Sequence, residues 1–307
     1  MSILTTHRAL LSRLLPDDQA DELAVRQGQF HHVVMGSDRV VCLPRTPAAA
    51  GRLPERVAAL RALAPLDLGF RTPEPLLHDS GPGADGTPFL VLSRISGEPL
   101  DADAFRDADA DAGAGAGAGA DADAEARALV AESVAAQYAT VLAGLGRAGA
   151  DETVRAVLPE AAPDRWQRFA ESVRAELFPL LSGQGRRRAE RELAAVQSLP
   201  HLTRAVVHGD LGPENVLWEW SDGLPRLSGV LDWDDVALGD PAEDLAAIGA
   251  GHGRQLLERV IALGGRSDSG LITRVDAIRG TFALQQALYG LLDGDEEELA
   301  DGLAGYR

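Results

Sequence analysis

The second half of this chain follows a helical pattern except in one short stretch, and that stretch constrains the fold most. Apolar residues recur at helical spacing in EARALVAESVAAQYATVLAGL before it, and helices resume at about Pro241 after it. The stretch reads AVVHGDLGPENVLWEW, then the turn sequence SDGLP, then RLSGVLDWDD. Two apolar runs joined by a glycine-containing turn predict a β-hairpin. The sequence therefore predicts a hairpin enclosed within a mainly helical domain.

Three oxygen-bearing side chains lie at regular positions in this stretch. Asp210 follows its first apolar run, Asn215 comes five residues later, and Asp232 ends the next apolar strand. Phosphoryl transfer needs a carboxylate to orient the attacking hydroxyl, and it needs oxygen ligands for Mg²⁺. A loop of this length can direct Asp210 towards an acceptor while Asn215 returns towards a metal shared with Asp232. The spacing predicts a phosphoryl-transfer site.

The first hundred residues carry strand signals instead, in LAVRQGQFHHVVMG, DRVVCLP and PFLVLSRI, with a helical pattern over residues 54–63. A chain of 307 residues exceeds the usual size of a single core, so two lobes with a cleft between them are expected. We expect an α+β fold with a small β-rich N-terminal lobe (residues 1–96) and a larger, mainly α C-terminal lobe (125–307). Between them, residues 97–124 form the hinge exit and an Asp/Ala/Gly-rich insertion, expected to be flexible because it has no apolar face.

This layout is that of the bilobal protein-kinase-like fold, and the motifs are more specific. HGDLGPEN, LDWDD and GDPAEDLA resemble the signature of the aminoglycoside phosphotransferase family, which belongs to the kinase-like superfamily. The resemblance implies an ATP-dependent enzyme that uses Mg²⁺ and phosphorylates an alcohol group. It implies Asp210 as the catalytic base, with Asn215 and Asp232 as the Mg²⁺ ligands.

Three further residues near the motifs are expected to be structural. The resemblance implies that His208 orders the catalytic loop, and a packed, hydrogen-bonded histidine is the more common role for such a residue. Asp240 can cap the free N–H groups of the following helix, with Pro241 in its first turn. Asp244, within the same helix start, receives a structural role as well.

The wider likeness concerns the acceptor. The chain resembles the branch of the family that inactivates tuberactinomycin peptide antibiotics of the capreomycin and viomycin type. The resemblance lies in LLSRLLP, GQFHHVV, VVCLPR, LGFRTPEPL, GTFALQQALY and DGDEEELADGL. It implies phosphorylation of a hydroxyl of the antibiotic, most simply that of a serine side chain. A net charge of −18 would concentrate such cationic peptides near the cleft, although acidity also serves ordinary solubility. The candidate acids for binding the cationic acceptor are Asp234, Asp235, Asp293 and Glu297.

The chain departs from the family at the phosphate-binding pair. The family has a basic residue on its third strand and a glutamate on the following helix. Here Cys42 stands at the first position and Arg56 at the second, and the sequence has no lysine. Arginine binds phosphate well through paired N–H donors. We expect Arg56, or failing that Arg45, to supply the missing positive charge, with Cys42 as a buried strand residue.

The remaining nucleotide contacts are weaker signals. The loop QGQFHH contains only Gly28, which either gives room for phosphate or forms a plain hairpin turn, and His31 and His32 are expected to be exposed on that loop. Adenine is expected against the backbone of the lobe-linking segment near Ser93 and Ile95.

Several classes of function are disfavoured. A field of this negative sign repels nucleic acid and anionic lipid, and no apolar stretch is long enough to predict a membrane span. The N-terminus lacks a signal-peptide pattern and Cys42 is the only cysteine, so we expect a cytoplasmic protein, with a monomer favoured. Two alternatives stay open: a kinase of another acceptor (an aminoglycoside, a macrolide or an amino alcohol), and a pseudokinase that binds nucleotide or drug without catalysis.

Overall fold

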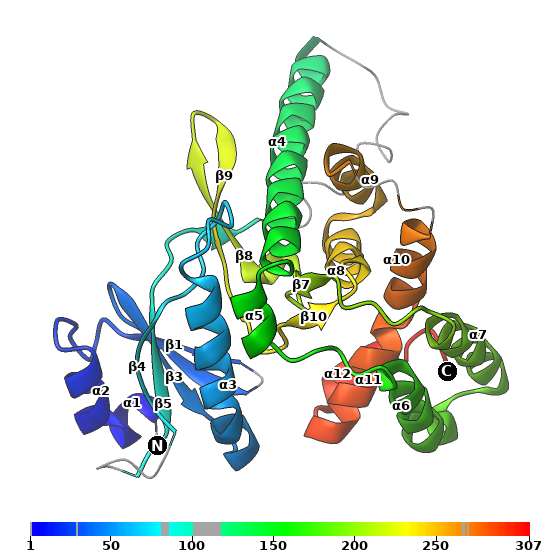
Figure 1. Ribbon diagram of the computed structural model, residues 1–307. Helices are drawn as coiled ribbons and strands as arrows, with labels where there is room; N and C mark the ends of the chain where they lie inside the picture. The colour runs from blue at the N-terminus through cyan, green and yellow to red at the C-terminus, as the bar shows by residue number, and fades with distance from the viewer. Residues whose placement is uncertain (1, 29, 81–85, 101–117, 266–267, 269) are drawn as a thin grey trace.

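An antiparallel sheet organises the N-terminal part of the computed structural model (Figure 1). The structure describes residues 2–28, 30–80, 86–100, 118–265, 268 and 270–307. Among these residues the sheet has five strands, in the order β1-β2-β3-β5-β4. The strands are β1 (Ala24–Gln27), β2 (His31–Met35), β3 (Arg39–Pro44), β4 (Pro75–Asp79) and β5 (Phe89–Ser93).

Different helices cover the two faces of this sheet, because successive strand residues point to opposite sides. Val41 of β3 packs in one core with α2 (Arg8–Leu14), which follows the short α1 (Ile3–Thr6). Its neighbour Cys42 belongs to the other core, with residues of α3 (Pro47–Leu63). α3 begins at Pro47 and not at Pro54, because the Thr46 hydroxyl caps it by accepting the N–H of Ala49 at 3.1 Å.

A short strand, β6 (Glu98–Pro99), connects the lobes by pairing with β8 (Val216–Ser221). Gly97 adopts a φ of 112°, and a Cβ there would lie 2.8 Å from the carbonyl oxygen of Trp218. The expected insertion, residues 97–124, lies mostly outside the described residues. Its last part is helical, because α4 already begins at Ala118.

The C-terminal lobe is mainly helical, as expected, and carries the predicted hairpin, whose tip projects beside α4 (Figure 1). β8 pairs with β9 (Leu224–Val230) through a turn in which Asp222 and Gly223 both have positive φ, the geometry of a tight hairpin turn. A second small sheet pairs β7 (Ala205–Val207) with β10 (Ala237–Gly239). The helices are α4 (Ala118–Ala148), α5 (Glu152–Val157), α6 (Arg165–Ser172), α7 (Gly183–Gln197), α8 (Ala242–His252), α9 (Arg254–Leu263), α10 (Leu271–Gly280), α11 (Phe282–Asp293) and α12 (Glu296–Gly302).

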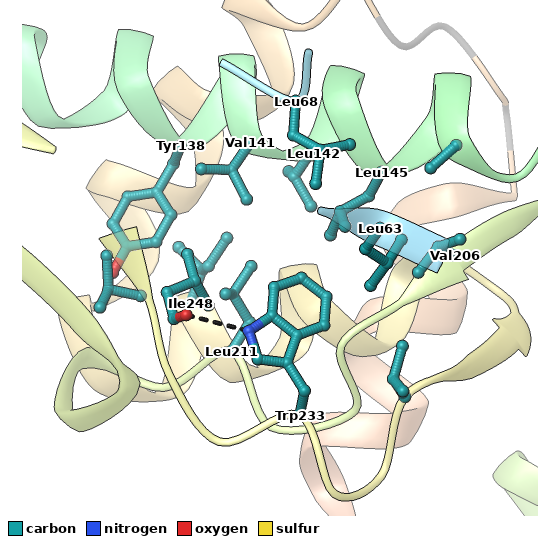
Figure 2. Packing of buried hydrophobic residues seen from close by; sticks show 14 of the residues in the cluster. Leu63, Leu68, Tyr138, Val141, Leu142, Leu145, Val206, Leu211, Trp233 and Ile248 are labelled. Carbon is teal, nitrogen blue, oxygen red and sulfur yellow. Dashed lines mark hydrogen bonds between the residues drawn. The ribbon is translucent and has the colours of Figure 1, made fainter. Parts of the chain in front are cut away.

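The long helix α4 is the spine of the main core. By length and composition alone its residues 124–148 could cross a membrane, with a mean hydropathy of 1.4. In the structure, however, Tyr138, Val141 and Leu145 are fully or almost fully buried against the rest of the protein. These residues belong to the same core cluster as Trp233, which is 1% exposed and faces α4 from the other side of the cluster (Figure 2). The apolar character of α4 is therefore accounted for by core packing.

Candidate active site

The catalytic loop leaves β7 and is closed by its own hydrogen bonds. The side-chain amide of Asn215 donates to Asp210 Oδ2 at 2.8 Å and to the Asp210 backbone oxygen at 2.9 Å. Asn215 ends the 3₁₀ turn Pro213–Asn215, which brings it back beside Asp210. Asp210 is accessible to solvent, but protein atoms crowd around it and partly desolvate the carboxylate. This burial raises the pKa of Asp210, against the opposing effect of the Asn215 hydrogen bond.

The loop that carries Asp232 is attached to the catalytic loop through the backbone. The N–H of Leu231 donates to the carbonyl oxygen of Asn215 at 2.8 Å, so the next residue, Asp232, lies beside Asn215. Asp232 has a φ of 58°, one of two positive values at non-glycine residues in the described chain. The next residue, Trp233, is fixed in the core, where its indole N–H donates to the carbonyl oxygen of Val230 at 2.9 Å (Figure 2).

The three residues predicted from the spacing are therefore brought together. The amide nitrogen of Asn215 is used by Asp210, which leaves its amide oxygen for another partner. The side chain of Asp232 is 54% exposed. Two carboxylates and an amide oxygen are the hard oxygen donors that Mg²⁺ prefers. Within the described residues no group of three His, Cys, Asp or Glu side chains could hold a metal ion, and a set at this position would include the amide oxygen of Asn215.

His208 connects the two loops. Its Nδ1 accepts the backbone N–H of Asp210 at 3.2 Å, so Nε2 carries the proton and donates to the carbonyl oxygen of Leu231 at 2.7 Å. The ring is fully buried and packs edge-on against Trp233, with 4.7 Å between centroids. Burial lowers the pKa of His208, which keeps it neutral and compatible with this hydrogen-bond pattern.

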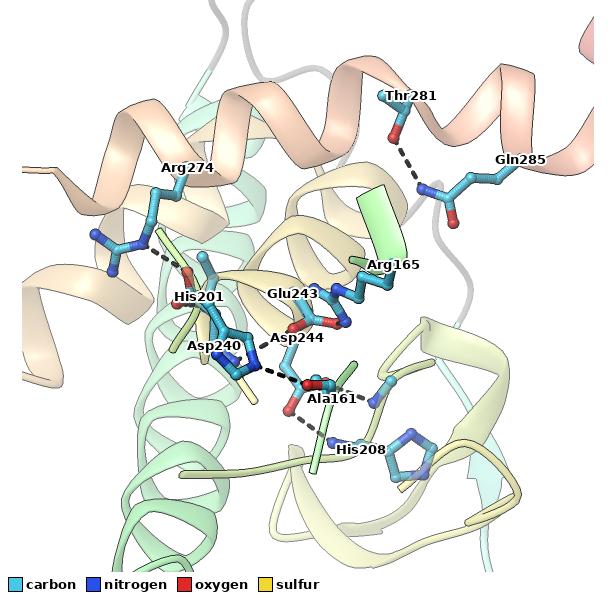
Figure 3. Close-up of polar contacts among 12 residues, drawn as sticks. Ala161, Arg165, His201, His208, Asp240, Glu243, Asp244, Arg274, Thr281 and Gln285 are labelled. Atoms are coloured by element: carbon cyan, nitrogen blue, oxygen red, sulfur yellow. Dashed lines mark hydrogen bonds and ion pairs between the residues drawn. The ribbon is translucent and has the colours of Figure 1, made fainter. Parts of the chain in front are cut away.

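Asp244, in the first turn of α8, supports the catalytic loop, and Asp240 fixes the beginning of the same helix (Figure 3). The Asp244 carboxylate accepts the backbone N–H groups of His208 at 3.0 Å and Gly209 at 3.1 Å. Asp240 accepts the N–H of Ala242 at 3.0 Å and forms a buried ion pair with Arg274 at 2.6 Å. Burial raises the pKa of Asp244 to about 7. Both acids thus bind protein groups in the described structure.

The charged residues at the interface between the lobes are arranged differently from the sequence assignment. Arg56 of α3 lies with its Nε 3.0 Å from Asp234 Oδ1, and one of its terminal nitrogens donates to Asp234 Oδ2 at 3.3 Å. His31, expected to be exposed, is 7% exposed on β2, with Nδ1 3.6 Å from Asp234. Burial raises the pKa of Asp234 to about 6, with Arg56 opposing. The carboxylate of Asp234 therefore contacts Arg56 and His31 of the N-terminal lobe, and not the open surface at which a cationic acceptor was expected to bind.

The other arginine considered for phosphate binding lies at the β1–β2 turn. Arg45 donates from its guanidinium to the carbonyl oxygen of Gly28 at 2.9 Å, while the N–H of Gly28 donates to the carbonyl oxygen of His31. Gly28 has no positive φ and closes a hairpin turn. Arg45 therefore supports the turn, whereas Arg56 lies next to Asp232, with 3.9 Å between their nearest charged atoms.

The two predicted residues of the lobe-linking segment differ in whether their backbone groups are used. The N–H of Ser93 donates to the carbonyl oxygen of Glu74, and the N–H of Arg94 donates to that of Asp38. Within the described part of the chain, neither backbone group of Ile95 has a hydrogen-bond partner. Ile95 is the better candidate of the two predicted residues to donate to a purine edge.

Of the remaining predicted acids, Asp235 and Asp293 share a neighbour, Tyr289. Asp235 is accessible to solvent, but surrounding protein atoms partly desolvate its carboxylate. This burial raises the pKa of Asp235, and the charge of Arg52 opposes the shift. Tyr289 of α11 is 54% exposed, and its pKa responds to the charges of Asp235, Arg52 and Asp293 as well as to burial. The charges of Asp235 and Asp293 therefore both act on Tyr289. Tyr289 could not be predicted as part of a site, because a single exposed aromatic residue has no periodicity.

Glu297 lies apart from these residues, in the first turn of α12. Its backbone N–H donates to the cap residue Asp295 at 3.1 Å. No contact within the described chain connects the Glu297 carboxylate to the catalytic loop.

A β-rich lobe, a mainly helical lobe with an embedded hairpin, and the Asp210, Asn215 and Asp232 set define a phosphotransferase of the protein-kinase-like class. A family model described as the phosphotransferase enzyme family matches residues 24–277, and the chain belongs to this family. The predicted fold class and the prediction of an enzyme are both confirmed.

Known relatives agree with this placement. The chain is 62% identical to viomycin phosphotransferase of Streptomyces vinaceus over 307 residues, 100% of both chains. It resembles the solved structure of an aminoglycoside 2'-phosphotransferase-IIIa in complex with GDP, with a TM-score of 0.79 and 20% identity over 99% of this chain and 97% of that one. A macrolide 2'-phosphotransferase from Brachybacterium faecium has a TM-score of 0.68 and 22% identity over 97% and 98% of the two chains. The two solved structures support the fold.

Proposed function

We propose that this enzyme transfers the γ-phosphoryl group of ATP to a hydroxyl of a tuberactinomycin antibiotic of the viomycin and capreomycin type, and so inactivates the drug. The observation that carries the proposal is the 62% identity to viomycin phosphotransferase over the full length of both chains. Catalytic loops do not encode the acceptor, so similarity that extends through the whole acceptor-facing lobe is the relevant support.

The geometry supports the following division of roles. The Asp210 carboxylate orients the acceptor hydroxyl and takes its proton as the acceptor oxygen bonds to the γ-phosphorus, while the bond between that phosphorus and the ADP oxygen breaks. Asn215 and Asp232 would hold Mg²⁺, which neutralises charge on the phosphates when bound. Ile95 would bind the purine edge through its backbone, with Ser93 close by. ATP as donor and a cytoplasmic monomer belong to the same proposal.

Asp235 and Asp293 are the acids best placed for a cationic acceptor. Both lie near Tyr289, whose exposed ring can stack on a guanidine-like group. Glu297 would add only to the general negative field that attracts polycations.

The test is phosphorylation of the drug itself. The purified enzyme is incubated with ATP, Mg²⁺ and either viomycin or capreomycin, and the mass of the drug is measured by mass spectrometry. We expect an added mass of about 80 Da, one phosphoryl unit. Kanamycin, a macrolide and a reaction without acceptor serve as controls. ADP release that depends on kanamycin or on the macrolide and not on either peptide would refute the proposed acceptor.

Asp210→Asn tests the catalytic role within the same assay. The amide cannot accept the proton, so kcat should fall by at least about 10³-fold while the unfolding transition stays near that of the parent. Nucleotide binding without turnover in the parent enzyme would favour a pseudokinase.

A further inference from the structure

The strand position at which the family places a basic residue holds Cys42, which is 2% exposed. Burial raises the pKa of its thiol, and the nearby Arg56 opposes this shift. Cys42 packs in the same core as Val57 of α3, so Arg56, the residue before Val57, brings its charge close to the position that a strand lysine would occupy. The positive charge is retained at this place, but it is supplied by a different element.

The anion that holds this arginine also comes from a different element. In the family pattern both members of the pair belong to the N-terminal lobe. Here Arg56 is held by Asp234, two residues after the predicted metal ligand Asp232. Trp233, between them, is fixed in the core, and this fixes the backbone of Asp234 as well.

The arginine is nearly buried yet incompletely paired. The side chain of Arg56 is 10% exposed, and its Nε lacks an aligned hydrogen bond although it lies 3.0 Å from Asp234. The Nε2 atom of His31, on the other side of Asp234, is also buried without a partner in the described residues. A buried ion pair gives little net stability compared with apolar residues, because both charges must be desolvated. Arg56 is therefore held at Asp234 by a contact that does not satisfy all of its donors, and one of its terminal nitrogens lies 3.9 Å from Asp232, where a further anion can complete its pairing.

We propose that Asp234 is a positioning residue for nucleotide binding: it holds Arg56 beside Asp232, so that the guanidinium meets the phosphates of the nucleotide. This inference rests on the proposed use of ATP and Mg²⁺. It reassigns Asp234 from the acceptor to the donor nucleotide. It also makes the phosphate-binding charge dependent on the position of the metal-binding loop, since one short segment carries both Asp232 and Asp234.

The first test measures nucleotide binding without any acceptor. Parent and variants are titrated with N-methylanthraniloyl ATP and Mg²⁺, and separately with adenosine. Loss of a charge-assisted contact to phosphate should weaken binding of the ATP analogue by about 10- to 100-fold in Arg56→Ala. Asp234→Asn should weaken it by about tenfold, because the arginine is present but no longer held. Adenosine has no phosphates, so its affinity should stay within about twofold of the parent in both variants.

Coupling between the two residues distinguishes positioning from independent roles. If Asp234 acts only through Arg56, the double variant Arg56→Ala/Asp234→Asn should bind the ATP analogue as weakly as Arg56→Ala alone. Asp234→Glu, which keeps the charge, should recover part of the affinity. In steady-state assays the KM for ATP should rise, with the KM for the antibiotic near that of the parent. Matched controls are Arg61→Ala at the exposed end of α3 and Asp222→Asn at the hairpin tip, each expected to match the parent.

Several outcomes would overturn the inference. Asp234 does not position Arg56 if the losses of ATP-analogue affinity in the two single variants multiply in the double variant. The same conclusion follows if Asp234→Asn raises only the KM for the antibiotic, or if it binds the nucleotide more tightly than the parent. Equal losses for adenosine and the ATP analogue would indicate a structural role only. If Asp234→Asn does not fold, the affinities of Asp234→Glu and Arg56→Lys for the ATP analogue and for adenosine are compared instead. A parent that binds the analogue but leaves the antibiotic unmodified refutes the proposed acceptor and not this inference, whereas a parent that binds no analogue refutes both.

Discussion

Asp244 is expected to hold the catalytic loop in place, and its removal should affect both stability and turnover. Asp244→Ala leaves the backbone N–H groups of His208 and Gly209 without their acceptor. Each unsatisfied buried N–H costs about 1–3 kcal/mol, and removing a buried carboxylate recovers part of this. We expect the free energy of unfolding to fall by about 2–4 kcal/mol. Because the same loop carries Asp210, kcat should fall at least about tenfold.

The matched control is Asp151→Ala. Asp151 also accepts two backbone N–H groups, those of Thr153 at 2.8 Å and Val154 at 3.1 Å, but it caps α5 at the surface. Loss of such a cap should lower stability by about 1 kcal/mol and leave kcat unchanged. The measurements are urea unfolding followed by tryptophan fluorescence, and steady-state kinetics. If Asp244→Ala lowers kcat no more than Asp151→Ala does, the loop does not depend on Asp244.

The raised pKa of Asp244 also fixes the sign of a pH effect. Burial raises it from an ordinary value of 3.8 to about 7 in the folded state. A group of this kind stabilises the fold fully below its unfolded pKa, and this contribution is lost as the pH rises through the folded pKa. The stability difference between the parent and Asp244→Asn should therefore be larger at pH 5 than at pH 8. A difference that grows between pH 5 and pH 8 would contradict the assignment.

Three further predictions follow. Asp232→Asn should raise the Mg²⁺ concentration for half-maximal activity by at least about tenfold, measured by ADP release at varied Mg²⁺, while Asp222→Asn should not. Burial lowers the pKa of His252 from 6.5 to about 4, so its contribution to stability is present above pH 6.5 and is lost towards pH 4. Urea unfolding should show this loss, up to about 3 kcal/mol, with a smaller slope in His252→Gln. Gly97→Ala should cost about 2–4 kcal/mol of unfolding free energy, because strain at positive φ adds to the clash with Trp218. Gly253→Ala, with positive φ but no atom within 4 Å of the added Cβ, should cost less.

The catalytic hairpin was predictable because its signals are local. The apolar runs, the Asp-Gly turn at 222–223 and the interval between Asp210 and Asn215 all depend on residues close together in the chain. Element boundaries were less predictable. The cap at Thr46 moved the start of α3 to Pro47, and α4 extends back into sequence that has no apolar periodicity.

The sequence by itself determined the two-lobed layout and the three oxygen donors of the catalytic centre, since hydrophobic period and short-range spacing encode both. Tertiary structure decided the partners of Asp234, Arg56 and His31. These residues come from the loop that carries Asp232, from α3 and from β2, and only the packing of the lobes around Trp233 brings them together. Charge pairing between distant segments leaves no periodic pattern in the chain. From the sequence, the Asp234 carboxylate was therefore assigned to a cationic drug, and only the fold shows that it pairs with Arg56.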